Sequence, residues 1–304
     1  MVLQTARSHG ASGRRWLDGL SELVVGLERD WGVIIGATLA GGTASYVAEA
    51  TTMDGSAAVV KMAMPAEFDG LGDLSNEITT LLLANGNGCA RLLRHDEDRR
   101  VLLLERLGRK LEDLALPVPG QLEIICTTLE RLWSLAPGTA ELPSGAEKGR
   151  WLAEDIARSW EDQHRPCSAR VIDRAISFTE NRIARFDPSC AVLVHGDAHG
   201  WNTLEESVGS SRFKFVDPDG LIAEREYDLA IPMREFNDEL LAGDPLAIGQ
   251  ARCRRLSQRT GTDADAIWEW GFIERVSTGL LLKKEGHEQL ANDFLHIAEL
   301  WAAG

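Results

Sequence analysis

Three oxygen-bearing side chains lie just after two short apolar runs in the second half of the chain. The run 191–194 leads into a His-Gly-Asp string that ends at Asp197, and Asn202 follows five residues later. A second run, 213–216, ends at Asp217. Transfer of a phosphoryl group to an alcohol uses a carboxylate that orients the hydroxyl, and the Mg²⁺ that assists it takes oxygen ligands. If the two runs pair as a hairpin, they present all three side chains together.

The same stretch admits other interpretations. A His-Gly-Asp string is short enough to arise by chance or to form a structural turn. His195 and His199 also have the i,i+4 spacing of zinc ligands, but Gly196 and Gly200 disfavour a continuous helix and no third ligand is evident. A metal-dependent hydrolase is therefore a distant alternative.

A lysine and a glutamate in the N-terminal third form a second set. Lys61 lies in the apolar run 57–64, and Glu77 follows sixteen residues later in a segment with helical character. A kinase needs a strand lysine that holds the ATP phosphates and a helical glutamate that fixes this lysine. Taken singly, each residue is more typical of a solvated surface. Their order relative to the later acidic motif favours the functional interpretation.

The string HGDxxxxN with a later strand-end aspartate resembles the catalytic and metal-binding loops of the aminoglycoside phosphotransferase family, which shares the protein-kinase fold. The resemblance implies that Asp197 is the catalytic base and that Asn202 and Asp217 bind Mg²⁺. The form Asp-Pro-x-Gly-Leu at residues 217–221, followed by Asp-Leu-Ala at 228–230, is similar to the streptomycin- and hydroxyurea-type kinases. Asp228 then matches an aspartate that supports the catalytic loop from the start of a helix.

The resemblance also implies a nucleotide site in the N-terminal third. No Walker A motif occurs, but the glycine-rich turn at residues 41–45 lies where a loop would cover the ATP phosphates. Alone, this turn would be an ordinary hairpin connection. The segment 102–108 corresponds to the hinge that binds adenine through main-chain atoms. The residues expected to bind ATP are Gly41, Gly42, Thr43, Ser45, Lys61, Glu77, Glu105 and Leu107.

The residue pattern around these motifs changes along the chain. Helical periodicity covers 15–30 and 75–84, and strand-like runs cover 33–39, 45–51, 57–64, 90–93 and 100–107, with Asp-Gly at 54–55 as a hairpin signal. Beyond residue 108, helices are expected at 121–135, 148–163, 169–186, 227–241, 245–260, 263–282 and 285–302. We therefore predict an α+β, protein-kinase-like bilobal fold. Residues 1–108 would form a small antiparallel sheet lobe that binds nucleotide, and residues 109–304 a larger helical lobe that carries catalysis and substrate binding.

The composition limits the classes of partner. The 304 residues carry a net charge of −15, which disfavours nucleic acids and anionic membrane surfaces and suits a cationic small molecule. There is no apolar run of about 20 residues and no signal-peptide pattern, so a cytoplasmic protein is expected. Five scattered cysteines without a CxxC spacing disfavour zinc knuckles and a disulfide framework. We expect a monomer or a weak homodimer.

Together, these features predict an ATP- and Mg²⁺-dependent O-phosphotransferase that acts on a small-molecule hydroxyl, with a streptomycin-type aminoglycoside as the expected acceptor. Acids that could contact a cationic acceptor are Glu235, Asp238, Glu239, Glu269 and Glu274, although each is also typical of a solvated helix face. Alternative acceptors are hydroxyurea, a basic peptide antibiotic, or a metabolic sugar or amine. A nucleotide-binding pseudoenzyme is a further alternative, and a protein kinase is disfavoured because no long activation segment follows Asp217.

Overall fold

The alternating runs in the N-terminal third form a five-stranded antiparallel sheet in the order β1-β2-β3-β5-β4. The computed structural model describes residues 2–39, 45–65 and 74–304. The strands are β1 (Val33–Thr38), β2 (Ser45–Thr52), β3 (Ala57–Ala63), β4 (Leu92–Asp96) and β5 (Val101–Glu105). The predicted Asp-Gly hairpin between β2 and β3 is confirmed, with Gly55 at φ 85° donating its N–H to the Thr52 carbonyl at 2.9 Å.

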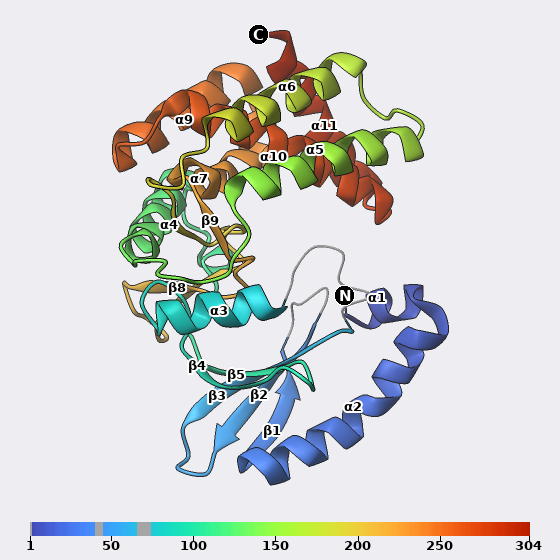
Figure 1. Ribbon diagram of the computed structural model, residues 1–304, viewed down its shortest axis with the longest axis vertical. Coiled ribbons are helices and arrows are strands. Elements are labelled where there is room, and N and C mark those ends of the chain that lie inside the picture. The colour runs from blue at the N-terminus through green and yellow to red at the C-terminus, as the bar shows by residue number, and fades with distance from the viewer. Residues whose placement is uncertain (1, 40–44, 66–73) are drawn as a thin grey trace. The chain divides into compact units, whose positions relative to one another are not determined.

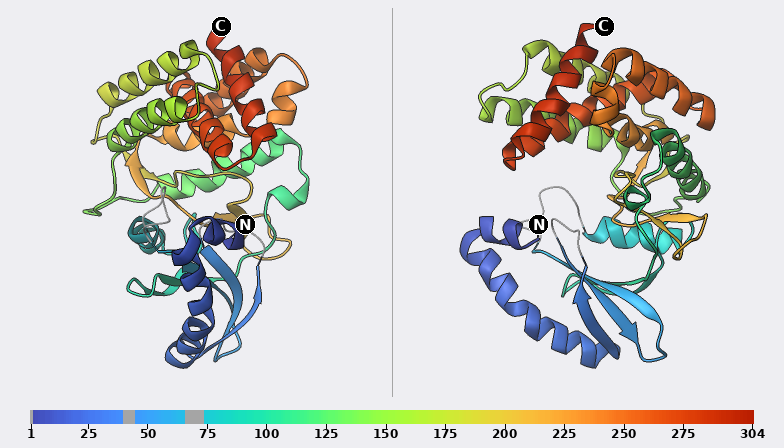
Figure 2. Two further views of the ribbon diagram at one scale, coloured as in Figure 1. Left: turned by 90° about the vertical axis from the view of Figure 1, so that its right-hand side faces the viewer. Right: turned by 180° about the vertical axis from the view of Figure 1, so that it is seen from behind.

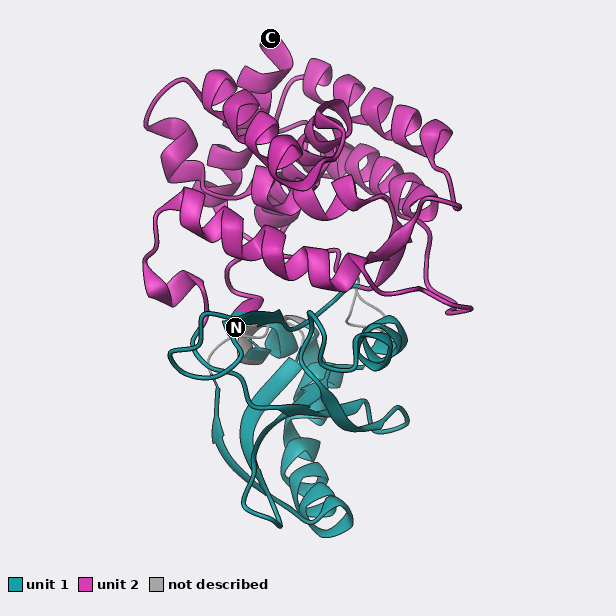
Figure 3. Ribbon diagram, turned by 90° about the vertical axis from the view of Figure 1, so that its left-hand side faces the viewer, with its two compact units in different colours: residues 1–109, 204–219 teal, residues 110–203, 220–304 magenta. Residues whose placement is uncertain are grey.

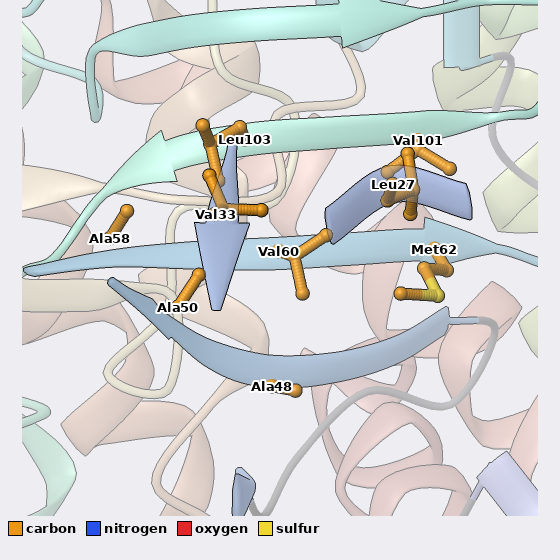
Figure 4. Close-up of a cluster of buried hydrophobic side chains, with 9 residues drawn as sticks. All are labelled: Leu27, Val33, Ala48, Ala50, Ala58, Val60, Met62, Val101 and Leu103. Carbon is orange, nitrogen blue, oxygen red and sulfur yellow. The ribbon is translucent and has the colours of Figure 1, made fainter. Parts of the chain in front are cut away.

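Helix α2 (Gly10–Trp31) packs on one face of this sheet and supplies Leu27 to its core (Figures 1 and 4). Side chains alternate between the faces of a strand, so Val60 and Met62 of β3 point to this core while Lys61 points to the other face. Helix α3 (Leu74–Ala84) lies on that other face and carries Glu77. The core cluster comprises Leu27, Val33, Ala48, Ala50, Ala58, Val60, Met62, Val101 and Leu103.

A second segment, from much later in the sequence, joins this sheet-bearing unit. The first compact unit comprises residues 1–109 together with 204–219, and the second comprises 110–203 and 220–304 (Figure 3). Strand β8 (Phe213–Phe215) pairs with β7 (Thr203–Glu205). Phe215 also donates its N–H to the Gly88 carbonyl and accepts from the N–H of Ala90, both at 2.8 Å. These bonds hold the segment that ends in Asp217 within the first unit.

The second unit is mainly helical, as the periodicity beyond residue 108 predicts. Helix α10 (Ala264–Lys284) packs against α5, α6, α7, α9 and α11 (Figures 1 and 2). A short antiparallel pair, β6 (Val192–Val194) with β9 (Leu221–Ala223), accompanies the helices. None of the helices among the described residues is long and apolar enough to cross a membrane. The helices are α4 (Val118–Trp133), α5 (Gly145–Asp162), α6 (Ala169–Arg185), α7 (Arg225–Arg234), α8 (Asn237–Leu241), α9 (Pro245–Thr260), α10 (Ala264–Lys284) and α11 (Glu288–Ala303).

Two expectations about local structure are wrong. The single helix expected at 227–241 is two helices, α7 and α8, because Phe236 adopts a left-handed conformation at φ 63° and interrupts the helical hydrogen bonding. The expected hairpin between runs 191–194 and 213–216 does not form, since β6 pairs with β9 and β8 pairs with β7. The short elements α1 (Val2–Ser8), η2 (Glu112–Leu114), β7 and β9 were not expected from the sequence.

The contact between α2 and the sheet gives a stability prediction. Leu27 is fully buried, whereas Val25 on the same helix is 63% exposed. Leu27→Ala removes buried methyl groups and leaves a cavity, which lowers the free energy of unfolding by about 2–5 kcal/mol. Val25→Ala, the matched control, should change it by less than about 0.5 kcal/mol. Urea unfolding measures both; equal effects would show that α2 does not pack on the sheet as described.

Candidate active site

The first unit holds a buried ion cluster centred on Lys61. Its Nζ donates to Glu77 Oε1 at 2.8 Å and Oε2 at 2.7 Å, and to Asp217 Oδ1 at 2.9 Å. Burial alone would lower the pKa of Lys61, but the charges of Asp217 and Glu77 outweigh it and raise this pKa above its usual value. The lysine therefore carries a fixed positive charge held by two carboxylates.

Asp217 reaches this cluster through an unusual backbone conformation. Its φ of 56° lies in the left-handed region, which costs a non-glycine residue about 1–2 kcal/mol. The residue lies two positions after the end of β8, the strand that Gly88 and Ala90 hold in the first unit. Such strain persists only where surrounding contacts enforce it, and it concentrates at functional positions. The bond from Lys61 and the anchoring of β8 provide that enforcement.

The second unit holds Asp197 and Asn202 in the loop after β6. Asn202 Nδ2 donates to both the backbone carbonyl and Oδ2 of Asp197, each at 3.0 Å, and His199 Nε2 lies 3.1 Å from the same Oδ2. Because both partners of Nδ2 are acceptors, the carbonyl oxygen of Asn202 is the atom left to bind a cation. Burial would raise the pKa of Asp197, but the charges of His199 and Arg234 outweigh it and hold this pKa well below its usual value. The carboxylate is therefore ionised.

Asp228, in the first turn of α7, fixes the start of this loop. Its fully buried carboxylate accepts the backbone N–H groups of His195 at 3.1 Å and Gly196 at 2.8 Å, and Trp133 Nε1–H at 2.8 Å. Gly196 has φ 87°, a conformation that glycine adopts without cost. The aspartate thus holds the backbone immediately before Asp197.

Arg234, at the end of α7, is a site residue that sequence reasoning missed. Its Nη2 donates to Asp197 Oδ1, its Nη1 to Glu274 Oε2 at 3.2 Å, and its Nε to Glu235 Oε1 at 3.1 Å. Only its position six residues after Asp228 ties it to a motif, and no sequence period marks it. It lies where α7 ends and the unexpected break at Phe236 begins.

The five candidate substrate acids lie in different environments. Glu235 and Glu274 share Arg234, as described. Glu239 pairs with Arg252, Glu269 pairs with Arg182 at 2.6 Å, and Asp238 is exposed. Only Glu235 and Glu274 are therefore connected to Asp197 through a shared partner.

The expected nucleotide residues lie in the first unit, where the structure describes them. Gly41, Gly42 and Thr43 lie outside the described residues, and Ser45 is the buried first residue of β2. Glu105 Oε1 accepts from Lys214 and from the backbone N–H of Arg91. Leu107 is buried, and within the described part of the chain its N–H and C=O make no backbone hydrogen bond.

The structure therefore brings the predicted residues together as two groups. Lys61, Glu77 and Asp217 form one cluster in the first unit, and Asp197 with Asn202 forms another in the second. His195 Nδ1 accepts the N–H of Asp197 at 3.1 Å. No group of three or more His, Cys, Asp and Glu side chains arranged to hold a metal ion occurs among the residues described.

Comparison with known proteins identifies the family. A model described as aminoglycoside/hydroxyurea antibiotic resistance kinase matches residues 30–286. The chain belongs to this family. It is 27% identical over 288 residues to a streptomycin 6-kinase of Streptomyces glaucescens, covering 94% of this chain and 90% of that protein. It is also 31% identical over 209 residues to a hydroxyurea phosphotransferase of Kitasatospora aureofaciens, covering 66% of this chain and 60% of that protein.

The solved structures show the fold of this kinase. The choline kinase LicA of Streptococcus pneumoniae superposes with a TM-score of 0.65 at 14% identity, covering 93% of this chain and 98% of that one. The predicted α+β, protein-kinase-like fold is thus confirmed. The kinase is a phosphotransferase that acts on a hydroxyl group of a small molecule.

Asp228 provides a test of how the loop of this kinase is held. Asp228→Asn replaces one carboxylate oxygen by an NH₂ group, which cannot accept a hydrogen bond. This NH₂ then faces the N–H of Gly196 or of His195, and the lost hydrogen bond should lower the free energy of unfolding by about 2–3 kcal/mol. Trp133→Phe removes one donor and leaves the carboxylate bonded to the loop, so it should cost about 1 kcal/mol. Urea unfolding of both variants measures the difference. A larger loss for Trp133→Phe than for Asp228→Asn would contradict this account of the loop.

Proposed function

We propose that this kinase transfers the γ-phosphoryl group of ATP, with Mg²⁺, to a hydroxyl group of a streptomycin-type aminoglycoside. The observation that carries the nucleotide part is the buried Lys61, held between Glu77 and Asp217. A charged lysine fixed by a helical glutamate is what a kinase uses to bind ATP phosphate oxygens. The match to streptomycin 6-kinase over nearly the whole length of both proteins supports the acceptor class.

Two residues of the chain suit the proposed Mg²⁺. Asn202 offers an amide oxygen in the second unit, and Asp217 offers a carboxylate in the first. Both are hard oxygen donors of the kind that Mg²⁺ prefers. When bound, Mg²⁺ would neutralise negative charge on the phosphate oxygens.

Asp197 would orient the acceptor hydroxyl. Its ionised carboxylate accepts hydrogen bonds, and a hydroxyl that donates to it turns its oxygen lone pair towards the phosphoryl group. The proton passes to solvent or to the carboxylate as the new oxygen–phosphorus bond forms and the bond to ADP breaks. As an ionised carboxylate, Asp197 would contribute mainly by positioning and by its charge.

The charge of the protein supports a cationic acceptor. The net charge is −15, and the partly exposed Glu235 pairs with Arg234, which contacts Asp197. Streptomycin-type aminoglycosides carry guanidinium groups next to their hydroxyls, which suits such surroundings. The 31% identity to a hydroxyurea phosphotransferase favours hydroxyurea as the second candidate acceptor.

The test is ADP release by the purified protein with Mg²⁺-ATP and a panel of acceptors: streptomycin, other aminoglycosides, basic peptide antibiotics and hydroxyurea. Streptomycin is expected to stimulate release most. Asp197→Asn should lower kcat by about 10³-fold or more and leave the Kd for ATP within about twofold, because it removes the carboxylate and keeps the shape.

Asp187→Asn is the matched control, since Asp187 lies in an exposed loop of the same unit and, among the residues that the structure describes, its carboxylate bonds to Ser189 and Cys190 alone. It should retain wild-type kcat. Stimulation by hydroxyurea alone would reassign the acceptor. ATP binding without transfer to any compound would favour a pseudoenzyme or a metabolic kinase, and undiminished turnover in Asp197→Asn would remove Asp197 from its role.

A further inference from the structure

Arg234 is the one cation that bonds directly to Asp197 Oδ1 within the described part of the second unit. The other carboxylate oxygen, Oδ2, is bonded by Asn202 and His199. Asp197 is therefore held from two sides: by its own loop at Oδ2, and by the end of α7 at Oδ1. A carboxylate fixed at both oxygens cannot rotate about its Cβ–Cγ bond without breaking one of these contacts.

Two acids besides Asp197 hold the guanidinium of Arg234 in place. Glu274, buried on α10, accepts from Arg234 Nη1 with Oε2 and from the Tyr227 hydroxyl with Oε1 at 2.8 Å. Glu235 accepts from Arg234 Nε. Since three different nitrogens of one planar group are engaged, the guanidinium has a single orientation.

The backbone around Arg234 is held by two further buried arginines. The last carbonyls of a helix lack partners within that helix. Here Arg252 Nη1 donates to the Glu235 carbonyl at 2.8 Å, and Arg275 Nη2 donates to the Arg234 carbonyl at 2.7 Å. Arg275 is fully buried, with its guanidinium over the rings of Phe294 and Trp301. The position of Arg234 therefore depends on packing across α7, α9, α10 and α11.

We propose that Arg234 is a positioning residue for the phosphoryl transfer. It holds the carboxylate of Asp197 in the one orientation in which this carboxylate can accept a hydrogen bond from the substrate hydroxyl. The proposal rests on the proposed function of Asp197. Arg234 acts through Asp197, so its loss should lower kcat rather than weaken nucleotide binding. A misplacement of about 1 Å at a reacting group can cost about 10²-fold in rate.

Two variants and one additive test the proposal, and a third variant is the control. Arg234→Ala should lower kcat by roughly 10²-fold, and Arg234→Lys by roughly 10-fold, because an ammonium restores charge without the planar fork. The Kd for ATP should stay within about threefold in both. Guanidinium ion at about 50 mM is far below the molar concentrations that unfold proteins. It should restore part of the activity of Arg234→Ala and should not raise the activity of the wild-type protein.

Arg259→Ala is the matched control. Arg259 bridges α9 to Glu123 and Glu130 of α4 in the same unit and does not contact the loop. It should keep kcat within about twofold, whatever its effect on the melting temperature. The proposal is overturned if the kcat of Arg234→Ala stays within about threefold of the wild-type value. It is also overturned if Arg234→Ala and Arg259→Ala lose folded protein alike and the loss of activity in Arg234→Ala is no larger than that loss of folded protein.

A crystallographic comparison separates this proposal from the proposed function. In the Arg234→Ala protein, the Asp197 carboxylate should rotate away from its wild-type orientation, and it should not do so in Arg259→Ala. An unchanged Asp197 orientation overturns the role of Arg234 even where turnover is lost. If the wild-type protein phosphorylates no acceptor, the proposed function fails, and the Asp197 orientation still decides whether Arg234 positions this carboxylate.

Discussion

The carboxylate of Asp228 holds the start of the Asp197 loop, on which the proposed chemistry of the second unit depends. It is fully buried, and its cost of desolvation is offset by hydrogen bonds that include three N–H donors. Two of these belong to His195 and Gly196, directly before Asp197, and the third comes from Trp133 on α4. One charge therefore joins the loop to two helices. Asp228 fixes the start of the loop, and hydrogen bonds within the loop, such as those from Asn202 to Asp197, hold the rest.

The two units carry different parts of the proposed chemistry and stabilise charge in different ways. In the first unit a lysine lies between two carboxylates; in the second a carboxylate lies between an arginine and a histidine. Desolvation disfavours the charged form of each central group. Partners of opposite charge keep both ionised, and so the positive charge of Lys61 and the negative charge of Asp197 are built into the fold before any ligand binds.

The sequence predicts these features unequally. The placement of Lys61 on a strand and of Glu77 on a helix can be predicted, because the alternation on β3 and the helical period on α3 are local patterns. The structure shows both elements, and the two side chains bond to each other. The partner strands of β6 and β8 cannot be predicted from the sequence. Each strand has three residues, and its partner is determined by distant contacts such as that of Phe215 with Gly88. Arg234 cannot be predicted for a related reason. Its position follows from the left-handed conformation of Phe236 and from hydrogen bonds made by Arg252 and Arg275, and a helical sequence pattern indicates none of these.

The return of residues 204–219 to the first unit has a consequence for how the chain is made. Strand β8 bonds to Gly88 and Ala90, and Asp217 completes the cluster around Lys61. These partners are separated by more than a hundred residues, so a ribosome exposes the five-stranded sheet long before it has produced Asp217. During that interval the buried Lys61 has Glu77 as its counter-ion without Asp217. The sheet unit therefore reaches its final charge balance only after helices α4, α5 and α6 of the second unit have been synthesised.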